Sequence, residues 1–70
     1  MKISYDPEVD ALSITFRDTT VTTKHLGDGI AADYDADGRL VGIEVLDAAL
    51  RLGGRDALER VIVEGIGLPV

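Results

Sequence analysis

A change in hydrophobic periodicity near residue 47 constrains the fold more than any other feature of this chain. Leu12, Ile14 and Phe16 alternate strictly with polar side chains, which is the two-residue period of a half-buried β-strand. After Asp47 the apolar residues recur at helical spacing instead. The sequence therefore predicts an α+β fold, in which an antiparallel sheet comes first and short helices follow.

Alternating apolar residues and β-branched runs, separated by turn residues, predict four to five strands. The short connections between them favour a β-meander, with the more polar third strand at an edge. We expect Tyr34 to pair with Arg39 across the last hairpin. Ala32 then meets Val41, which gathers apolar side chains on one face, although a one-residue bulge would shift this register. The predicted strands are 3–5, 12–16, 20–26, 30–34 and 39–45.

One or two short helices, packed on the sheet, are predicted after the last strand. Asp47 is a suitable N-cap for a helical turn that ends before the Gly53–Gly54 pair. Asp56 and Glu59 have the spacing of a capping box and predict a second helix that runs to Ile62. The tail beyond it is apolar and is expected to be irregular.

The chain of 70 residues is expected to form a single domain, 1–70. A domain of this size buries only about 60% of the surface of its unfolded chain. No cysteine is present, so disulfides cannot supplement the core. A bound metal or a second subunit could do so instead, and we favour a second subunit. We expect a homodimer built from the C-terminal helices and tail, because residues 48–70 are electrically neutral; within them, 53–70 hold the last helix and the apolar tail. Residues 48–70 hold Asp56, Glu59 and Glu64 against Arg51, Arg55 and Arg60.

The net charge of −6 lies entirely within residues 1–47, where ten acidic residues face four basic ones. Such a surface repels phosphate backbones, so nucleic-acid binding is not expected. It suits a basic protein partner, and it also serves solubility. No run approaches the roughly 18 apolar residues of a membrane span, and no apolar signal segment opens the sequence. We therefore expect a cytoplasmic protein without membrane contact.

A calcium-loop pattern overlaps the predicted fourth turn. Asp33, Asp35, Asp37, Gly38 and Glu44 satisfy the spacing of an EF-hand loop, and carboxylates suit a hard cation. The segment before them contains two glycines, however, and cannot supply the helix that such a loop requires. We interpret the pattern as a β-hairpin and predict no metal site. The four carboxylates remain the candidates if a divalent cation does bind.

No catalytic constellation is recognisable in the sequence. The chain has one histidine, His25, and no cysteine, and no residue is marked as a nucleophile with its base. No phosphate-binding glycine motif is present, and no cofactor is expected. Because thirteen carboxylates occur in 70 residues, some will lie close together by chance. We therefore predict no catalytic residues and a protein that is not an enzyme.

Three segments together resemble the YuzE-like family of small prokaryotic proteins, which is a domain of unknown function. They are the opening residues 1–12, the hairpin 33–38 and residues 42–48. The resemblance covers 1–52 and leaves 53–70 outside the family pattern. It implies a compact β-rich domain and carries over no catalytic residues. The resemblance also implies an antitoxin-like or immunity role, because some members of the family are encoded beside small toxin-like proteins.

The leading functional hypothesis is a non-enzymatic protein-interaction module, with an acidic surface for a basic partner. The first alternative is a divalent-cation-binding domain that uses the hairpin from Asp33 to Glu44. The second alternative is a small enzyme whose site the sequence does not reveal.

Overall fold

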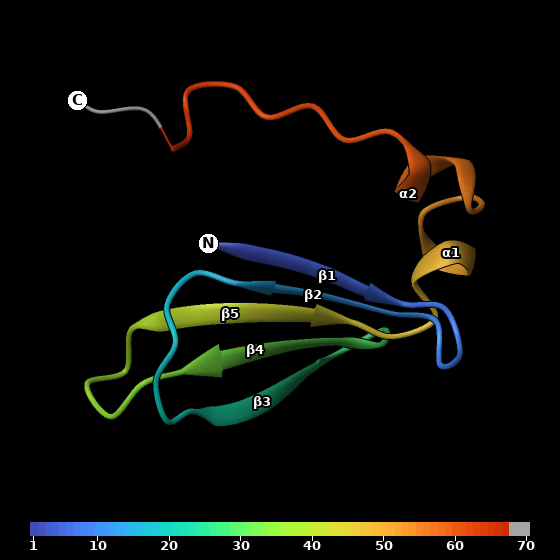
Figure 1. Cartoon of the computed structure of the whole chain (residues 1–70). Coiled ribbons are helices and arrows are strands. Elements are labelled where there is room, and N and C mark those ends of the chain that lie inside the picture. The colour runs from blue at the N-terminus through green and yellow to red at the C-terminus, as the bar shows by residue number, and fades with distance from the viewer. Residues whose placement is uncertain (68–70) are drawn as a thin grey trace.

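The computed structural model describes residues 1–67 and contains a single antiparallel sheet followed by two helical turns (Figure 1). The predicted α+β fold class is confirmed, because all five strands precede Asp47 and helix occurs only after it. The elements are β1 (Lys2–Asp6), β2 (Ala11–Thr15), β3 (Thr22–Gly27), β4 (Ile30–Tyr34), β5 (Leu40–Val45), α1 (Ala48–Arg51) and α2 (Asp56–Glu59).

The strand order is β1-β2-β5-β4-β3, so the last strand lies in the centre of the sheet. A strict meander would have placed β3 beside β2. Instead, the link between β2 and β3 passes the ends of β5 and β4 (Figure 1), and β3 pairs only with β4. The composition of the strands explains the exchange: β5 is rich in apolar residues, whereas all six residues of β3 are exposed. The position of the polar third strand at an edge agrees with the prediction.

The predicted register of the β4–β5 hairpin is wrong by two residues. Ala32 lies opposite Ile43 rather than Val41. One residue of the difference arises in the turn, where the Asp35 backbone N–H donates to the Arg39 carbonyl at 3.0 Å. The second arises at a bulge at the end of β4. Because a two-residue shift preserves side-chain alternation, the apolar residues still share one face.

The first helix, α1, begins after Asp47 as predicted, but Asp47 does not cap it with its side chain. Asp47 adopts a left-handed conformation, with φ of 51°. The free N–H groups of α1 instead bond to Asp10: Ala48 N–H donates to its carbonyl and Ala49 N–H to its carboxylate, each at 2.9 Å. A residue from the β1–β2 turn therefore anchors the start of α1.

The second helix, α2, is a single turn without the predicted capping box. The chain becomes extended at Arg60, so the prediction that this helix continues to Ile62 is wrong. Leu58 is the one residue of α2 that is half-buried, and the others are exposed. Because most helical stability in proteins comes from packing of an apolar face, a helix without a buried face is not stabilised beyond one turn. Both helices lie beyond the strand ends (Figure 1) and make few contacts with the strands, so they do not form the expected layer on the sheet.

The core is consequently small. The buried apolar residues are Ala31, Ala32, Val41 and Ala48, and no large side chain among residues 1–67 is fully buried. The cross-strand pairs nevertheless sort the side chains into two contrasting faces. The polar face carries Lys2, Ser4, Asp6, Ala11, Ser13, Thr15, Thr23, His25, Ala31, Asp33, Gly42 and Glu44. The apolar face carries Ile3, Tyr5, Leu12, Ile14, Thr22, Lys24, Ile30, Ala32, Tyr34, Ile43 and Val45.

Candidate functional site

Two carboxylates meet in the middle of the polar face. Asp33 on β4 lies opposite Gly42, and Glu44 on β5 lies opposite Ala31, which makes the two acids diagonal neighbours. Diagonal side chains on adjacent strands are within reach of each other. The Thr23 hydroxyl on β3 donates a hydrogen bond of 2.6 Å to Asp33 Oδ1. Three neighbouring strands therefore contribute to this carboxyl pair.

The absence of a side chain at Gly42 lets Asp33 lie across β5. A Cβ atom at this position would come within 3.1 Å of Asp33 Oδ2 and 3.1 Å of the Ile14 carbonyl. These approaches are tighter than ordinary van der Waals contact, and one of them is to backbone that cannot move aside easily. Glycine in a central strand often marks such a close approach. Here it accommodates the Asp33 carboxylate.

The electrostatics of the pair favour a bound proton or an added positive charge. Partial burial raises the pKa of Glu44 above its ordinary value, and the negative charge of Asp33 raises it further. His25, which lies opposite Ala31 on the same face, acts in the other direction. A cation placed between the two carboxylates would offset their repulsion and favour the ionised form of Glu44. The site is therefore suited to a basic side chain.

A third carboxylate, that of Asp35, holds the β4–β5 turn together. Its Oδ1 accepts hydrogen bonds of 2.9 Å from the backbone N–H groups of Asp37 and Arg39. Arg17, which follows the end of β2 at Thr15, forms an ion pair with its other oxygen. The bond from Arg39, with help from Arg17 and Asp37, lowers the pKa of Asp35. Its side chain is only 7% exposed, so Asp35 acts as a structural residue of the turn.

The four cation candidates are thus divided between two places. Asp33 and Glu44 lie on the polar face, whereas Asp35 and Asp37 belong to the turn. Within residues 1–67, no group of three or more acidic, histidine or cysteine side chains is placed to hold a metal ion. The predicted hairpin is confirmed, and it separates the residues that a calcium loop would bring together.

Sequence reasoning missed the role of Asp10. Its carboxylate accepts a hydrogen bond of 2.6 Å from the Tyr5 hydroxyl and one of 2.9 Å from the Ala49 N–H. The hydrogen bond from Tyr5 is the main cause of the lowered pKa of Asp10, and the bond from Ala49 lowers this pKa further. The Tyr5–Asp10 hydrogen bond also raises the pKa of Tyr5. Asp10 is one of three non-glycine residues with positive φ among the described residues. The signal available in the sequence was an aspartate in the β1–β2 turn that follows a tyrosine by five residues.

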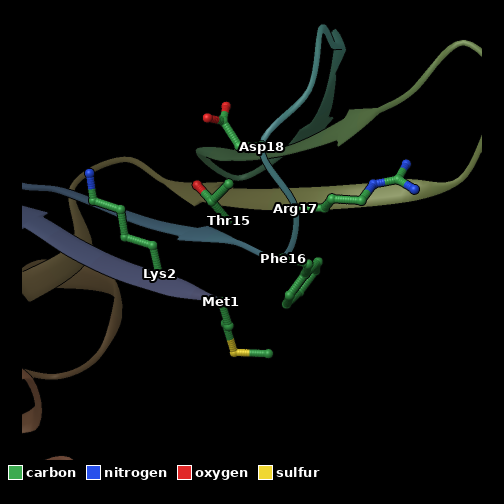
Figure 2. Close-up of a pocket in the computed structure, with 6 residues that line it drawn as sticks. All are labelled: Met1, Lys2, Thr15, Phe16, Arg17 and Asp18. Atoms are coloured by element: carbon green, nitrogen blue, oxygen red, sulfur yellow. The ribbon is translucent and has the colours of Figure 1, made fainter. Parts of the chain in front are cut away.

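A shallow hollow of about 330 Å³ lies where β1 begins and β2 ends. Figure 2 shows that its side chains diverge: Lys2 and Thr15 point to one side of the sheet, and Met1 and Phe16 to the other. No convergent polar groups of the kind that fix a small ligand are present here. The hollow does show that Met1 and Phe16 continue the apolar face beyond the paired strands.

Fold and site define a small single-layer sheet with one polar face, which carries the carboxyl pair, and one apolar face. A family model described as "Protein of unknown function (DUF2283)" matches residues 2–48. The chain belongs to this family, which agrees with the expected assignment to a domain of unknown function. The match ends within α1, so the second helix and the tail lie outside it. Comparisons with curated proteins and with solved structures found no match.

No helix among the described residues is long and apolar enough to cross a membrane.

Proposed function

We propose that this chain is a non-enzymatic, homodimeric protein-interaction module that uses the polar face of its sheet to bind a basic protein. The observation that carries the proposal is the carboxyl pair Asp33–Glu44 on the polar face of the central strands, in which Thr23 holds the Asp33 carboxylate. Among residues 1–67 the one ion pair is that of Asp35 with Arg17. Neither member of the carboxyl pair thus forms an ion pair within the described part of the chain, and His25 is the one basic residue on the same face that acts on Glu44.

A basic partner matches the energetics of this pair. The raised pKa of Glu44 reflects a cost of keeping two carboxylates ionised side by side on a partly buried surface. A lysine or arginine side chain from another protein would supply the missing positive charge. The chain's net charge of −6 would also steer such a partner toward the surface and repel nucleic acids.

The setting of the proposal is the cytoplasm, where a cysteine-free chain fits. The resemblance to YuzE-like proteins belongs to the proposal as well, and with it an antitoxin-like role in which a small basic protein is the partner. The homodimer is proposed because the described residues form a single layer without any large fully buried side chain, and a sheet needs a second layer to bury its apolar side.

The test is an isolation of the partner from the native organism, followed by kinetics with the purified pair. The association rate should fall steeply as ionic strength rises. The double variant Asp33→Asn/Glu44→Gln should lower it strongly. Asp37→Asn/Asp18→Asn is the matched control, because it removes the same charge from exposed turn positions, and its effect should be distinctly smaller.

Three results would overturn the proposal. The captured partner could be acidic, the two double variants could weaken binding equally, or the purified protein could bind duplex DNA tightly at physiological salt. Each would show that the carboxyl pair is not the recognition surface for a basic protein.

A further inference from the structure

The apolar face of the sheet has no covering layer. Ile3 is 49% exposed and Ile30 is 38% exposed, while Leu12, Ile14 and Ile43 between them are half-buried. Antiparallel sheets commonly leave one face in water, but that face is then polar. In this sheet the polar face is the one that can remain in contact with water. The apolar face is therefore the one that requires a covering layer.

The charge distribution indicates the nature of that partner. The acids of the paired strand positions, Asp6, Asp33 and Glu44, all lie on the polar face. Lys24 is the one charged residue on the apolar face, and its ammonium group lies over the Tyr34 ring at 5.5 Å. Two copies of a chain with net charge −6 can therefore approach through this face with little like-charge repulsion. Among residues 1–67, the one acidic group hydrogen-bonded to a side chain of this face is the Asp10 carboxylate, which the Tyr5 hydroxyl already occupies, so a basic protein would find little complementary charge there.

The surface area also fits a second copy. The chain exposes 5511 Å², whereas a folded monomer of 7.5 kDa is expected to expose about 4,200 Å². The excess of roughly 1,300 Å², to which the exposed side chains of residues 61–66 also contribute, exceeds the approximately 800 Å² that each partner buries in a standard interface. The radius of gyration, 13.1 Å, is likewise larger than the approximately 11 Å of a compact chain of this length.

The chain's own C-terminal segment does not supply this layer. Val61, Ile62, Val63 and Ile66 are 55–70% exposed, and no backbone hydrogen bond joins residues 60–67 to the sheet. A segment packed on the apolar face would bury these side chains together with Ile3. Both surfaces remain exposed instead.

We propose that two copies of the chain pack their sheets face to face through the apolar faces, so that the dimer is a two-layer sandwich. This inference rests on the proposed homodimer and names its interface as the sheet rather than the C-terminal helices and tail. A two-fold axis would place Ile3 of each copy within or beside the shared layer. The polar faces would then point outward on both sides of the dimer and remain free for basic partners.

The test compares neighbouring residues that point to opposite faces. Ile3→Glu places a charge on the apolar face, while Ser4→Glu places the same charge on the polar face one residue along β1. In sedimentation equilibrium at micromolar concentration, Ile3→Glu should weaken the dimer roughly 100-fold or more, because each interface would bury two unpaired carboxylates. Ser4→Glu should leave the dimer intact. Circular dichroism of each variant is the check that it is folded.

A second measurement does not depend on the folding of a charged variant. Because the chain contains no cysteine, Ile3→Cys and Ser4→Cys each introduce a single thiol. The thiol at position 3 should become protected from a maleimide reagent as protein concentration rises, whereas that at position 4 should not. A dimer that persists when residues 65–70 are deleted would further support the sheet as the interface.

Two outcomes would overturn the inference, and they are distinguishable. A wild-type species of 7.5 kDa at micromolar concentration would refute the homodimer itself. A stable dimer in which Ile3→Glu has no effect, both thiols react equally, and deletion of 65–70 abolishes association would keep the homodimer. It would move the interface to the C-terminal segment.

Discussion

The small core makes Val41 the position where truncation should cost most. Val41 is 2% exposed on the central strand β5. Val41→Ala removes two methyl groups, worth about 0.8 kcal/mol each in lost burial, and leaves a cavity that adds to the loss. The expected decrease in the free energy of unfolding is about 2 kcal/mol. A domain of this size has a total of only roughly 3.5–10 kcal/mol, so the loss is a large fraction.

The assay is thermal unfolding followed by circular dichroism at one fixed protein concentration, because self-association makes the melting temperature depend on concentration. For a domain of 60–100 residues, 1 kcal/mol corresponds to a shift of about 4–8 °C. Val41→Ala should therefore lower the melting temperature by roughly 8–16 °C. Val61→Ala is the matched control: the same atoms are removed, but Val61 is 65% exposed, and its effect should stay within about 0.5 kcal/mol.

Equal losses for the two variants would refute the reasoning, because they would show that Val61 is as well packed as Val41. If the loss at Val61 also grew with protein concentration, the tail would belong to a subunit interface. An unchanged melting temperature for Val41→Ala would show that the central strand is not where the core lies.

Three further outcomes are expected. Glu44→Gln should raise the melting temperature at pH 7, because the raised pKa means that folding disfavours the ionised form of Glu44. Melting curves recorded across pH should show that this gain decreases as pH falls through the raised pKa and is absent below the usual 4.5. Asp10→Asn should lower the melting temperature and speed hydrogen exchange of the Ala49 amide. Because the pKa of Asp10 is lowered, the stabilising effect of its carboxylate is present above the usual 3.8 and is lost as pH falls through the lowered value. A lower melting temperature of the variant that persists in strong acid would show that the ionised carboxylate is not the source of the stabilisation. Calcium at millimolar concentration should leave the melting temperature nearly unchanged, because turn amides and Arg17 occupy the Asp35 carboxylate. A site of micromolar affinity would instead add about 4 kcal/mol to the free energy of unfolding. A large rise in melting temperature that Asp35→Ala abolishes would show that a calcium site does form.

Local sequence patterns were sufficient to locate the strands. The alternation of Leu12 and Ile14 with polar neighbours, and the glycine and aspartate residues of the turns, predict segments that the structure confirms as β2 and its neighbours. These signals depend on the two-residue period and on turn conformations, which are properties of a few adjacent residues. The sequence also places Asp33 and Glu44 on one face of a hairpin, because alternation survives a register error of two residues.

The order of the strands, the register of the hairpin and the cap of α1 were decided only by tertiary structure. Strand order depends on which strand buries the most apolar surface, and β5 gains the central position over β3 by competition across the whole sheet. Asp10 reaches Ala49 across 39 residues, so no local window contains both partners. Short-range order follows from the sequence because neighbouring residues fix it. Long-range pairing does not, because it is selected among alternatives by the packing of the complete chain.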